Sequence, residues 1–310
     1  MARSAGIHHV TAIASDPRRN LDFYTRVIGL RFVKKTVNFD DPSTYHFYFG
    51  DEVGSPGTIL TFFPWSHVAP GRPGVGQTLE VAFRVPEEAL GFWMERFVSH
   101  GVTHEAPTRR FERTVLPFRD PDGTRLALVG TSGLAGSHAW TTADVPAEAA
   151  VRGFAGVTLL VDRPEPTAAV LTQVFGFVQG ARTENIIRYR GEADVGAYVD
   201  LRIAGGFLPG TLGAGSVHHI AFRAASDADQ AAMAKALREK FGIATTEQKE
   251  RNYFRSIYFR EPGGVIFEIA TDDPGFAIDE PRDALGTSLK LPPFYEKDRE
   301  RIEAALPLLD

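Results

Sequence analysis

The chain has 310 residues, of which 43% are hydrophobic, and its 34 basic and 39 acidic residues give a formal net charge of -5. This length suggests about two domains, and the spread of charge argues against nucleic acid as a partner. No segment approaches the roughly 18 apolar residues of a membrane span, and the N-terminus does not read as a signal peptide, so we expect a cytoplasmic protein. Because there is no cysteine, any bound metal must be held by histidine and carboxylate side chains.

An internal repeat organises the chain, and a repeat of this length indicates the fold more strongly than local propensity does. GIHHVTAI from Gly6 matches GFAGVTLL from Gly153, and GQTLEVAFRV from Gly76 matches GSVHHIAFRA from Gly215. A later pair of stretches, LPFRDPDGTRLAL and IYFREPGGVIFEI, matches in the same order. The sequence therefore predicts four modules that begin near these four glycines.

The sequence of each module predicts the same series of elements, which the first module illustrates. A β-branched stretch that indicates a strand comes first. Asp16 and Pro17 then supply an N-cap and a first-turn proline, and Gly29 ends the helix. Three more strands follow, and in the second and fourth modules the last two are joined by a tight turn, at residues 120–123 and 261–264. The predicted unit is βαβββ and the predicted fold class is α+β.

Along the chain the four modules form two halves: the first two modules lie in residues 1–145 and the last two in residues 146–270. The remaining segment, 271–310, lies outside the repeat and includes an expected amphipathic helix from about Glu296 to Leu306. We expect this tail to act as a lid that could restrict water and shape a binding pocket.

Residues 6–270 resemble the vicinal oxygen chelate superfamily, in which βαβββ modules pair into open eight-stranded cups. Its members include glyoxalase I, bleomycin-resistance proteins and extradiol ring-cleaving dioxygenases. HHVT from His8, the stretch from Arg31, SVHHIAF from Ser216, RNYFRSIYFREPGGVIFEIA from Arg251 and the tail are similar to the hydroquinone-type ring-cleaving dioxygenases. The resemblance implies a non-haem Fe(II) enzyme that opens a dihydroxylated aromatic with O₂.

The repeat allows each candidate ligand to be compared with its counterpart in the sister module. Three candidates are replaced there, although the surrounding glycines and apolar positions are kept: His9 by Gly156, His219 by Glu80 and Glu268 by Ala127. Two histidines and one carboxylate are the ligands of the Fe(II) facial triad. A lone strand histidine is usually a satisfied half-buried side chain, but a carboxylate in an apolar strand is costly to bury unpaired. The combination favours a metal site.

The ligand positions also predict how the modules pair in space. If the first module paired with the second and the third with the fourth, Gly156 would stand where a ligand is required. The first and fourth modules should therefore form a metal-binding cup, with His9 beside His219 and Glu268. The second and third should form a cup without metal, which gives one metal per chain.

Two residues near the expected metal take roles from the resemblance alone. It implies that Tyr258, which Pro117 replaces in the sister module, donates a hydrogen bond to substrate or oxygen. The resemblance also implies that His218 corresponds to a histidine that lies beside the substrate in the hydroquinone-type dioxygenases. His8 is a weaker candidate, as a substrate-binding residue. Regular strand alternation would instead turn His8 and His218 away from the cup, so packing roles stay open for both.

Arg251 and Thr11 carry weaker predictions as substrate-binding residues. Arg251 falls where the similar enzymes place a substrate-contacting arginine, yet Arg110 preserves it in the sister module, so a structural salt bridge is a rival interpretation. Thr11 is repeated as Thr158, and its hydroxyl could simply satisfy backbone. The remaining histidines lack a partner at metal spacing and are interpreted as surface or packing residues: His46, His67, His100, His104 and His138.

Fe(II) is the expected cofactor, although Mn²⁺ suits the same ligands and Zn²⁺ or Ni²⁺ could replace iron during handling. The expected partners are a small aromatic substrate and O₂, with homo-oligomerisation left open. A metal-dependent glyoxalase-like lyase or isomerase is the first alternative, but such sites typically need a second carboxylate as base. A non-enzymatic, bleomycin-resistance-like binding protein is the second alternative, and such proteins generally lack the ligands.

Overall fold

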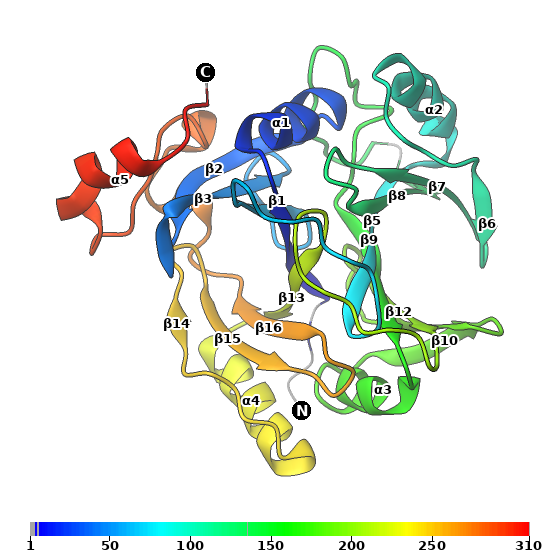
Figure 1. The fold of residues 1–310 in the computed structure, drawn as a ribbon. Coiled ribbons are helices and arrows are strands. Elements are labelled where there is room, and N and C mark those ends of the chain that lie inside the picture. The colour runs from blue at the N-terminus through cyan, green and yellow to red at the C-terminus, as the bar shows by residue number, and fades with distance from the viewer. Residues whose placement is uncertain (1–3, 5, 135, 310) are drawn as a thin grey trace.

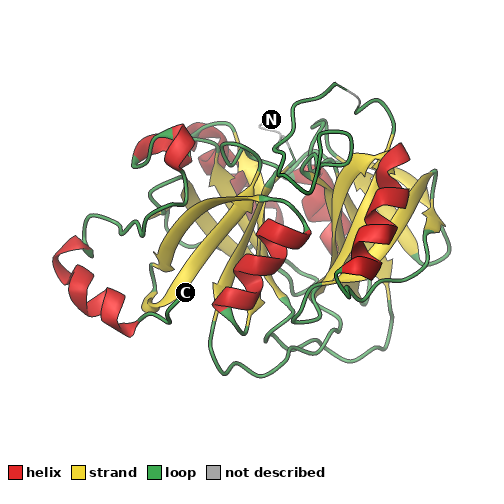
Figure 2. Ribbon diagram, turned by 90° about the horizontal axis from the view of Figure 1, so that it is seen from above, coloured by secondary structure: helices red, strands yellow, loops and turns green. Residues whose placement is uncertain are grey.

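Two curled, open sheets make up the protein in a computed structural model that describes Ser4 and residues 6–134 and 136–309. The sheets lie side by side with helices on their outer faces (Figures 1 and 2). Each sheet has eight strands. None of the helices in the described ranges has both the length and the apolar character needed to span a bilayer.

The first sheet is built from the two ends of the repeat, in the strand order β14-β15-β16-β13-β1-β4-β3-β2. The first module supplies β1 (Ile7–Ala14), α1 (Pro17–Asp22), a π-helical turn (Phe23–Val27), β2 (Arg31–Asn38), β3 (Asp41–Gly50) and β4 (Ile59–Pro64). The fourth supplies β13 (Val217–Ala224), α4 (Asp227–Phe241), β14 (Lys249–Glu250), β15 (Arg255–Arg260) and β16 (Ile266–Thr271).

The second sheet has the equivalent order β10-β11-β12-β9-β5-β8-β7-β6. The second module supplies β5 (Gln77–Pro86), a 3₁₀ turn (Glu87–Ala89), α2 (Leu90–Ser99), β6 (Thr108–Arg110), β7 (Arg113–Arg119) and β8 (Arg125–Thr131). The third supplies β9 (Phe154–Val161), α3 (Pro164–Gln173), β10 (Val178–Arg182), β11 (Ile186–Arg190) and β12 (Tyr198–Ile203). The predicted α+β fold and the pairing of modules one with four and two with three are confirmed.

The tight turns predicted between the last two strands of a module join the two cups. Asp120 accepts a hydrogen bond from the hydroxyl of Tyr24, in the helical segment of the first module, at 2.9 Å. Glu261 accepts one from Thr167 on α3 of the third module at 2.7 Å. Each turn thus reaches the helix of the neighbouring cup, and its buried carboxylate is satisfied there.

The C-terminal tail extends the free edge of the first sheet. Lys290 donates its backbone N–H to Lys35 of β2, and Lys34 on the same strand is fully buried, with its ammonium 2.5 Å from both Asp279 and Glu280. Short 3₁₀ turns follow one another along the tail at Phe276–Ile278, Arg282–Ala284 and Glu296–Asp298 before α5 (Arg299–Ala305). The helix predicted from about Glu296 is therefore present.

We predict that Lys34→Met lowers the free energy of unfolding by about 3 kcal/mol, because two carboxylates of the tail then lose their buried cation. Urea denaturation followed by circular dichroism measures the change. Lys35→Met, on the neighbouring half-buried lysine, is the matched control and should shift stability by less than about 0.5 kcal/mol. Equal losses in the two variants would show that the tail is not held through Lys34.

Candidate metal centre

One row of paired residues across three neighbouring strands brings the candidate ligands together. Ala221 on β13 pairs with His9 on β1 on one side and with Glu268 on β16 on the other. His219 precedes Ala221 by two residues and so faces the same side of the sheet. Because Ala221 has only a methyl side chain, space remains between the larger groups that flank it.

The three predicted ligands converge on one point inside the cup. Glu268 Oε2 lies 3.3 Å from His9 Nε2 and 2.9 Å from His219 Nε2, and the three donor atoms lie within 4.8 Å of one another. Glu268 Oε1 accepts a hydrogen bond from Ser256, whereas Oε2 has no hydrogen-bond partner among the described residues. A buried carboxylate oxygen with no donor is costly, so this donor set fits a cation.

The electrostatics of the site prepare these groups to bind a metal. Burial by itself would raise the pKa of Glu268, but the neighbouring His9 and His219 lower that pKa well below its usual value. Burial also lowers the pKa of His219, which outweighs the opposing effect of Glu268. An ionised carboxylate and a neutral imidazole are the forms that coordinate metal ions.

A β-bulge lies on each of the two strands at the histidine that precedes a candidate ligand. His8 is the extra residue between two paired positions of β1, and His218 is the extra residue at the equivalent place on β13. Their Nδ1 atoms lie 2.9 and 2.8 Å from Nδ1 of the histidine that follows each of them. A bulge re-aims side chains, so the regular alternation that would turn His218 away from the cup does not hold, and His218 lines the cavity.

His8 does not share that position. It is buried and packs edge-on against His9 and Phe254. Its place behind a candidate ligand suits orientation of that ligand better than contact with a small molecule.

His46 is a residue whose position the sequence did not indicate. Its Nδ1 lies 2.9 Å from the hydroxyl of Tyr48 and its Nε2 lies 2.8 Å from the hydroxyl of Thr61, which in turn donates to Thr11 at 2.8 Å. His46 packs against the rings of Tyr48 and Phe63, as its interpretation as a packing residue expects, and it also lines the same cavity as the candidate ligands. His67, His100 and His138 are exposed, as expected.

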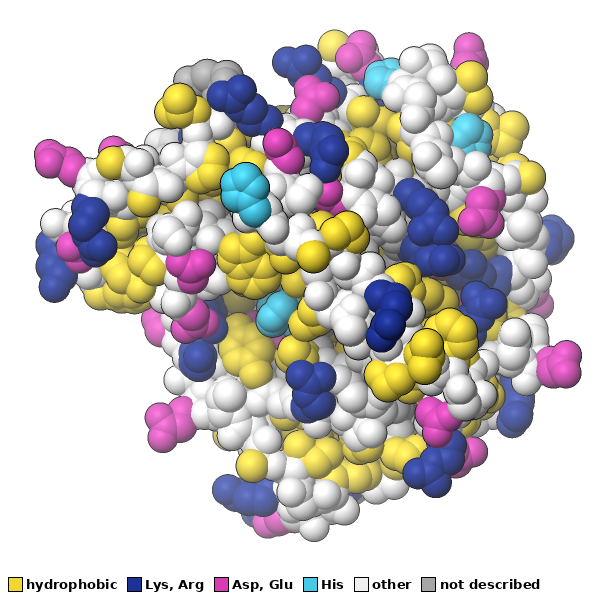
Figure 3. All heavy atoms as spheres, viewed as in Figure 1, with side chains coloured by type: hydrophobic (Ala, Val, Ile, Leu, Met, Phe, Trp, Pro, Cys, Tyr) yellow, Lys and Arg dark blue, Asp and Glu magenta, His cyan; other side chains and the backbone are white. Residues whose placement is uncertain are grey.

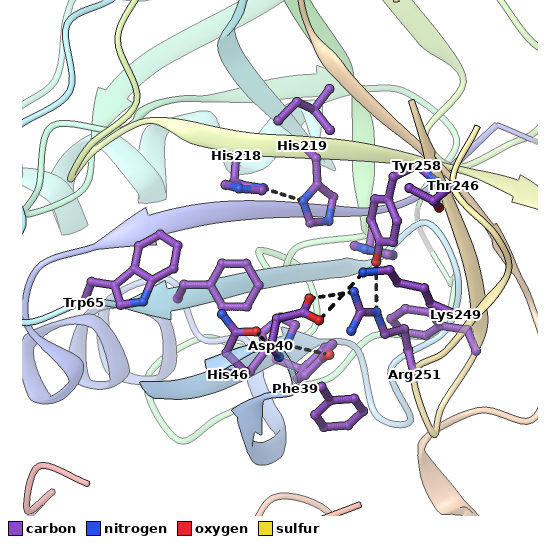
Figure 4. Close-up of a pocket in the computed structure, with 16 residues that line it drawn as sticks. Phe39, Asp40, His46, Trp65, His218, His219, Thr246, Lys249, Arg251 and Tyr258 are labelled. Atoms are coloured by element: carbon purple, nitrogen blue, oxygen red, sulfur yellow. Dashed lines mark hydrogen bonds and ion pairs between the residues drawn. The ribbon is translucent and has the colours of Figure 1, made fainter. Parts of the chain in front are cut away.

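The candidate ligands open onto a cavity of about 360 Å³. Figure 3 shows a hollow on this face with a histidine visible inside it, and Figure 4 shows the side chains that line it. Its walls are largely aromatic and apolar: Phe39, Tyr48, Phe63, Trp65, Phe254 and Ile266. Apolar and aromatic walls, with polar groups at the candidate ligands and at the mouth, suit a small aromatic molecule.

Tyr258 on β15 and Arg251, just after the edge strand β14, approach the candidate ligands from one side of the sheet. Tyr258 pairs with Glu268 across β15 and β16, and its hydroxyl accepts a hydrogen bond from Arg251 Nε at 3.2 Å. Burial and then the charge of Glu268 raise the pKa of Tyr258 well above its ordinary value. The hydroxyl therefore keeps its proton at neutral pH and can donate it to a hydrogen bond.

The sister cup uses the equivalent positions for packing. The matching row is Gly156, Ala82 and Ala127, and a Cβ on Gly156 would lie 2.2 Å from the backbone oxygen of Tyr198. Glu80, at the position of His219, accepts hydrogen bonds from Arg110. The second cup thus has a close ring contact and an ion pair at the positions of the candidate ligands. Arg110 pairs with Glu80 of its own cup, and Arg251 likewise pairs with a carboxylate of its own cup, Asp40, but also donates a hydrogen bond to Tyr258.

One side chain beside the metal position was missed, although the repeat carried a signal for it. Ser256, which donates to Glu268, corresponds to Val115 in the sister module. The same comparison of sister modules could have added Ser256 to the candidate site, because it is a polar residue at a position that is apolar in the other copy. Two eight-stranded cups, with one buried His–His–carboxylate cluster among the described residues, define a glyoxalase-fold protein with a candidate metal site.

Comparison with known proteins agrees with this class. Residues 6–128 match the family model described as "Glyoxalase/Bleomycin resistance protein/Dioxygenase superfamily". The chain is 43% identical over 304 residues to "Putative ring-cleaving dioxygenase MhqO" of Bacillus subtilis, with 98% of this chain and 96% of that protein covered. It belongs to the glyoxalase/bleomycin resistance/dioxygenase superfamily.

Two further matches extend over nearly the whole chain. "Chlorohydroquinone/hydroquinone 1,2-dioxygenase" of Sphingobium indicum is 34% identical, with 97% of this chain and 95% of that protein covered. A crystal structure of a Bacillus subtilis protein titled a "putative dioxygenase" aligns with a TM-score of 0.95 at 42% identity, covering 100% of this chain and 99% of that one. Relatives named as dioxygenases therefore share both the full length and the fold.

We predict that His219→Ala lowers the metal content of the purified protein roughly tenfold or more, since even loss of groups that support a ligand weakens binding by about that much. Elemental analysis measures the metal, and circular dichroism should show unchanged folding. His46→Ala is the matched control, because it removes an imidazole from the same cavity whose nitrogens bond to Tyr48 and Thr61. Equal metal in both variants would contradict the assignment of His219.

Proposed function

We propose that the protein is a non-haem Fe(II) dioxygenase that opens the ring of a hydroquinone-type aromatic with O₂, with His9, His219 and Glu268 as the iron ligands. The observation that carries the proposal is the buried Oε2 of Glu268, which has no hydrogen-bond partner in the described chain and faces two histidine Nε2 atoms. Bound iron would supply Lewis acidity and a template for substrate and O₂. Mn²⁺ fits the same ligands, whereas Zn²⁺ or Ni²⁺ would be substitutes.

The protein groups around this centre would position the substrate and control its protons. His218 has a pKa lowered to about 3, by burial first and then by His219, so it is neutral at pH 7. If His219 binds metal through Nε2, its Nδ1 carries a proton that is donated to Nδ1 of His218. The proton of His218 then resides on Nε2, which makes this side chain a hydrogen-bond donor.

Tyr258 and Arg251 would form the other polar wall of the substrate site. Tyr258 stays protonated and can donate to a substrate oxygen, while the guanidinium of Arg251 holds the Tyr258 hydroxyl in place. Thr11 and His8 are proposed to act from behind the ligands, through Thr61 and His9 respectively. Water is limited by the apolar walls of Phe63, Trp65 and Phe254.

The preference for para-dihydroxylated rings over catechols rests on similarity to the Sphingobium indicum protein named for chlorohydroquinone and hydroquinone. The tail would support the mouth of the cavity, because Tyr295 donates a hydrogen bond to the backbone of Phe39, which lines it. The lid function predicted for residues 271–310 is retained in this form.

We predict that protein loaded anaerobically with Fe(II) consumes about one O₂ per molecule of hydroquinone or chlorohydroquinone, because both oxygen atoms enter the product. An oxygen electrode and the product absorbance measure the reaction, with catechol as the comparison substrate. His219→Ala should consume none. Absence of uptake with all three diols would contradict the proposal, and turnover independent of O₂ would indicate a glyoxalase-like reaction.

We predict that Tyr258→Phe lowers kcat about 100-fold, the usual scale for loss of a positioned proton or hydrogen-bond donor. The melting temperature should change little, because the substituted ring fills the same space. Tyr189→Phe is the matched control, since it removes a hydroxyl that reaches Gln179 in the metal-free half. An unchanged kcat for Tyr258→Phe would exclude this tyrosine from the reaction.

A further inference from the structure

An ion bridge crosses the mouth of the cavity. Asp40, in the turn after β2, has its Oδ2 3.0 Å from Arg251 Nη2 and its Oδ1 3.7 Å from Lys249 Nζ on β14 (Figure 4). β2 and β14 are the two outermost strands of the first sheet. One carboxylate therefore links the two free edges of the curled sheet, above the cavity that all three residues line.

The bridge is unequal in charge and in exposure. Two cations share one carboxylate, and the side chains of Asp40, Lys249 and Arg251 are 62%, 43% and 15% exposed. Figure 3 shows acidic and basic side chains side by side along the rim of the hollow. An ion pair with one exposed partner contributes little stability, so the carboxylate is exchangeable. The guanidinium of Arg251 is mostly shielded from water, so an anion beside it is needed to balance its charge.

The proposed reaction generates such an anion. Opening a hydroquinone ring beside a hydroxyl-bearing carbon breaks one carbon–carbon bond and places both atoms of O₂ in the product. The hydroxyl-bearing carbon becomes a carboxylic acid and its neighbour an aldehyde, so ring carbons are oxidised, O₂ is reduced and no other reagent is needed. The acid loses its proton at neutral pH, because carboxyl pKa values lie near about 4. A neutral substrate thus becomes an anion within the cavity.

We propose, on the basis of the proposed function, that Lys249 and Arg251 form a carboxylate-binding site at the cavity mouth, and that Asp40 is the internal ligand which the ring-opened product displaces. A neutral diol cannot compete with Asp40 for the two cations. A product carboxylate can, and its binding breaks the only ionic link between β2 and β14 that the described residues provide here. Formation of the product therefore opens its exit.

Isothermal titration calorimetry of the metal-loaded protein with benzoate tests the site, with neutral benzamide as the isosteric comparison. Asp40→Asn should bind benzoate about fivefold more tightly than the unmodified protein, because the internal competitor is lost. Lys249→Gln should bind it about threefold more weakly. Neither substitution should alter benzamide binding. Glu247→Gln is the matched control, since it removes one exposed carboxylate from the segment that carries Lys249.

Two outcomes would overturn the proposal. One is an Asp40→Asn variant whose affinity for benzoate changes no more than that of Glu247→Gln, which would mean that Asp40 does not compete with anions. The other is equal tightening toward benzamide, which would mean that the cavity has only become more open. The measurement involves no turnover, so a protein without dioxygenase activity would refute the proposed function and still report on this site.

Discussion

The antiparallel contact between β1 and β13 is the constraint on which the rest of the site depends. It joins the first and last modules of the repeat, and its register places His9 opposite Ala221, which also pairs with Glu268. A shift of one residue would turn every side chain of β1 to the other face of the sheet. Three candidate ligands from distant parts of the chain therefore meet only because two strands pair in one register.

The repeat shows how the same framework supports two different interiors. Both cups keep the bulges on their central strands, with Leu79 and Ala155 at the places of His218 and His8. The bulge is therefore a property of the fold, and the histidine on it belongs to one site. In the second cup Arg188 pairs with Asp200 and lies 3.7 Å from the centre of the Tyr198 ring. That ring lies where a side chain on Gly156, the position of the candidate ligand His9, would otherwise be.

Most of the fold and the centre of the site could be predicted from the sequence, because the repeat offered an internal comparison. Equivalent positions that differ between the two copies pointed to His9, His219 and Glu268 as candidate ligands. That comparison could not place His218, since alternation along a strand fails where a bulge inserts a residue. It could not place His46 either, because the hydrogen bonds that aim its ring come from Tyr48 and Thr61, and the pairing of Thr61 with Tyr48 across strands is invisible in the linear order.

The tail shows how a segment outside the repeat can still influence the site. Asp279 receives hydrogen bonds from the side chains of Tyr253 and Asn252 as well as from Lys34. Those two residues directly follow Arg251, so the tail helps to hold the turn from which the guanidinium reaches Tyr258. Farther along, Tyr295 holds the backbone of Phe39, next to Asp40. The tail therefore contacts both sides of the ion bridge, so it helps the sheet to hold the two edges of the cup in place.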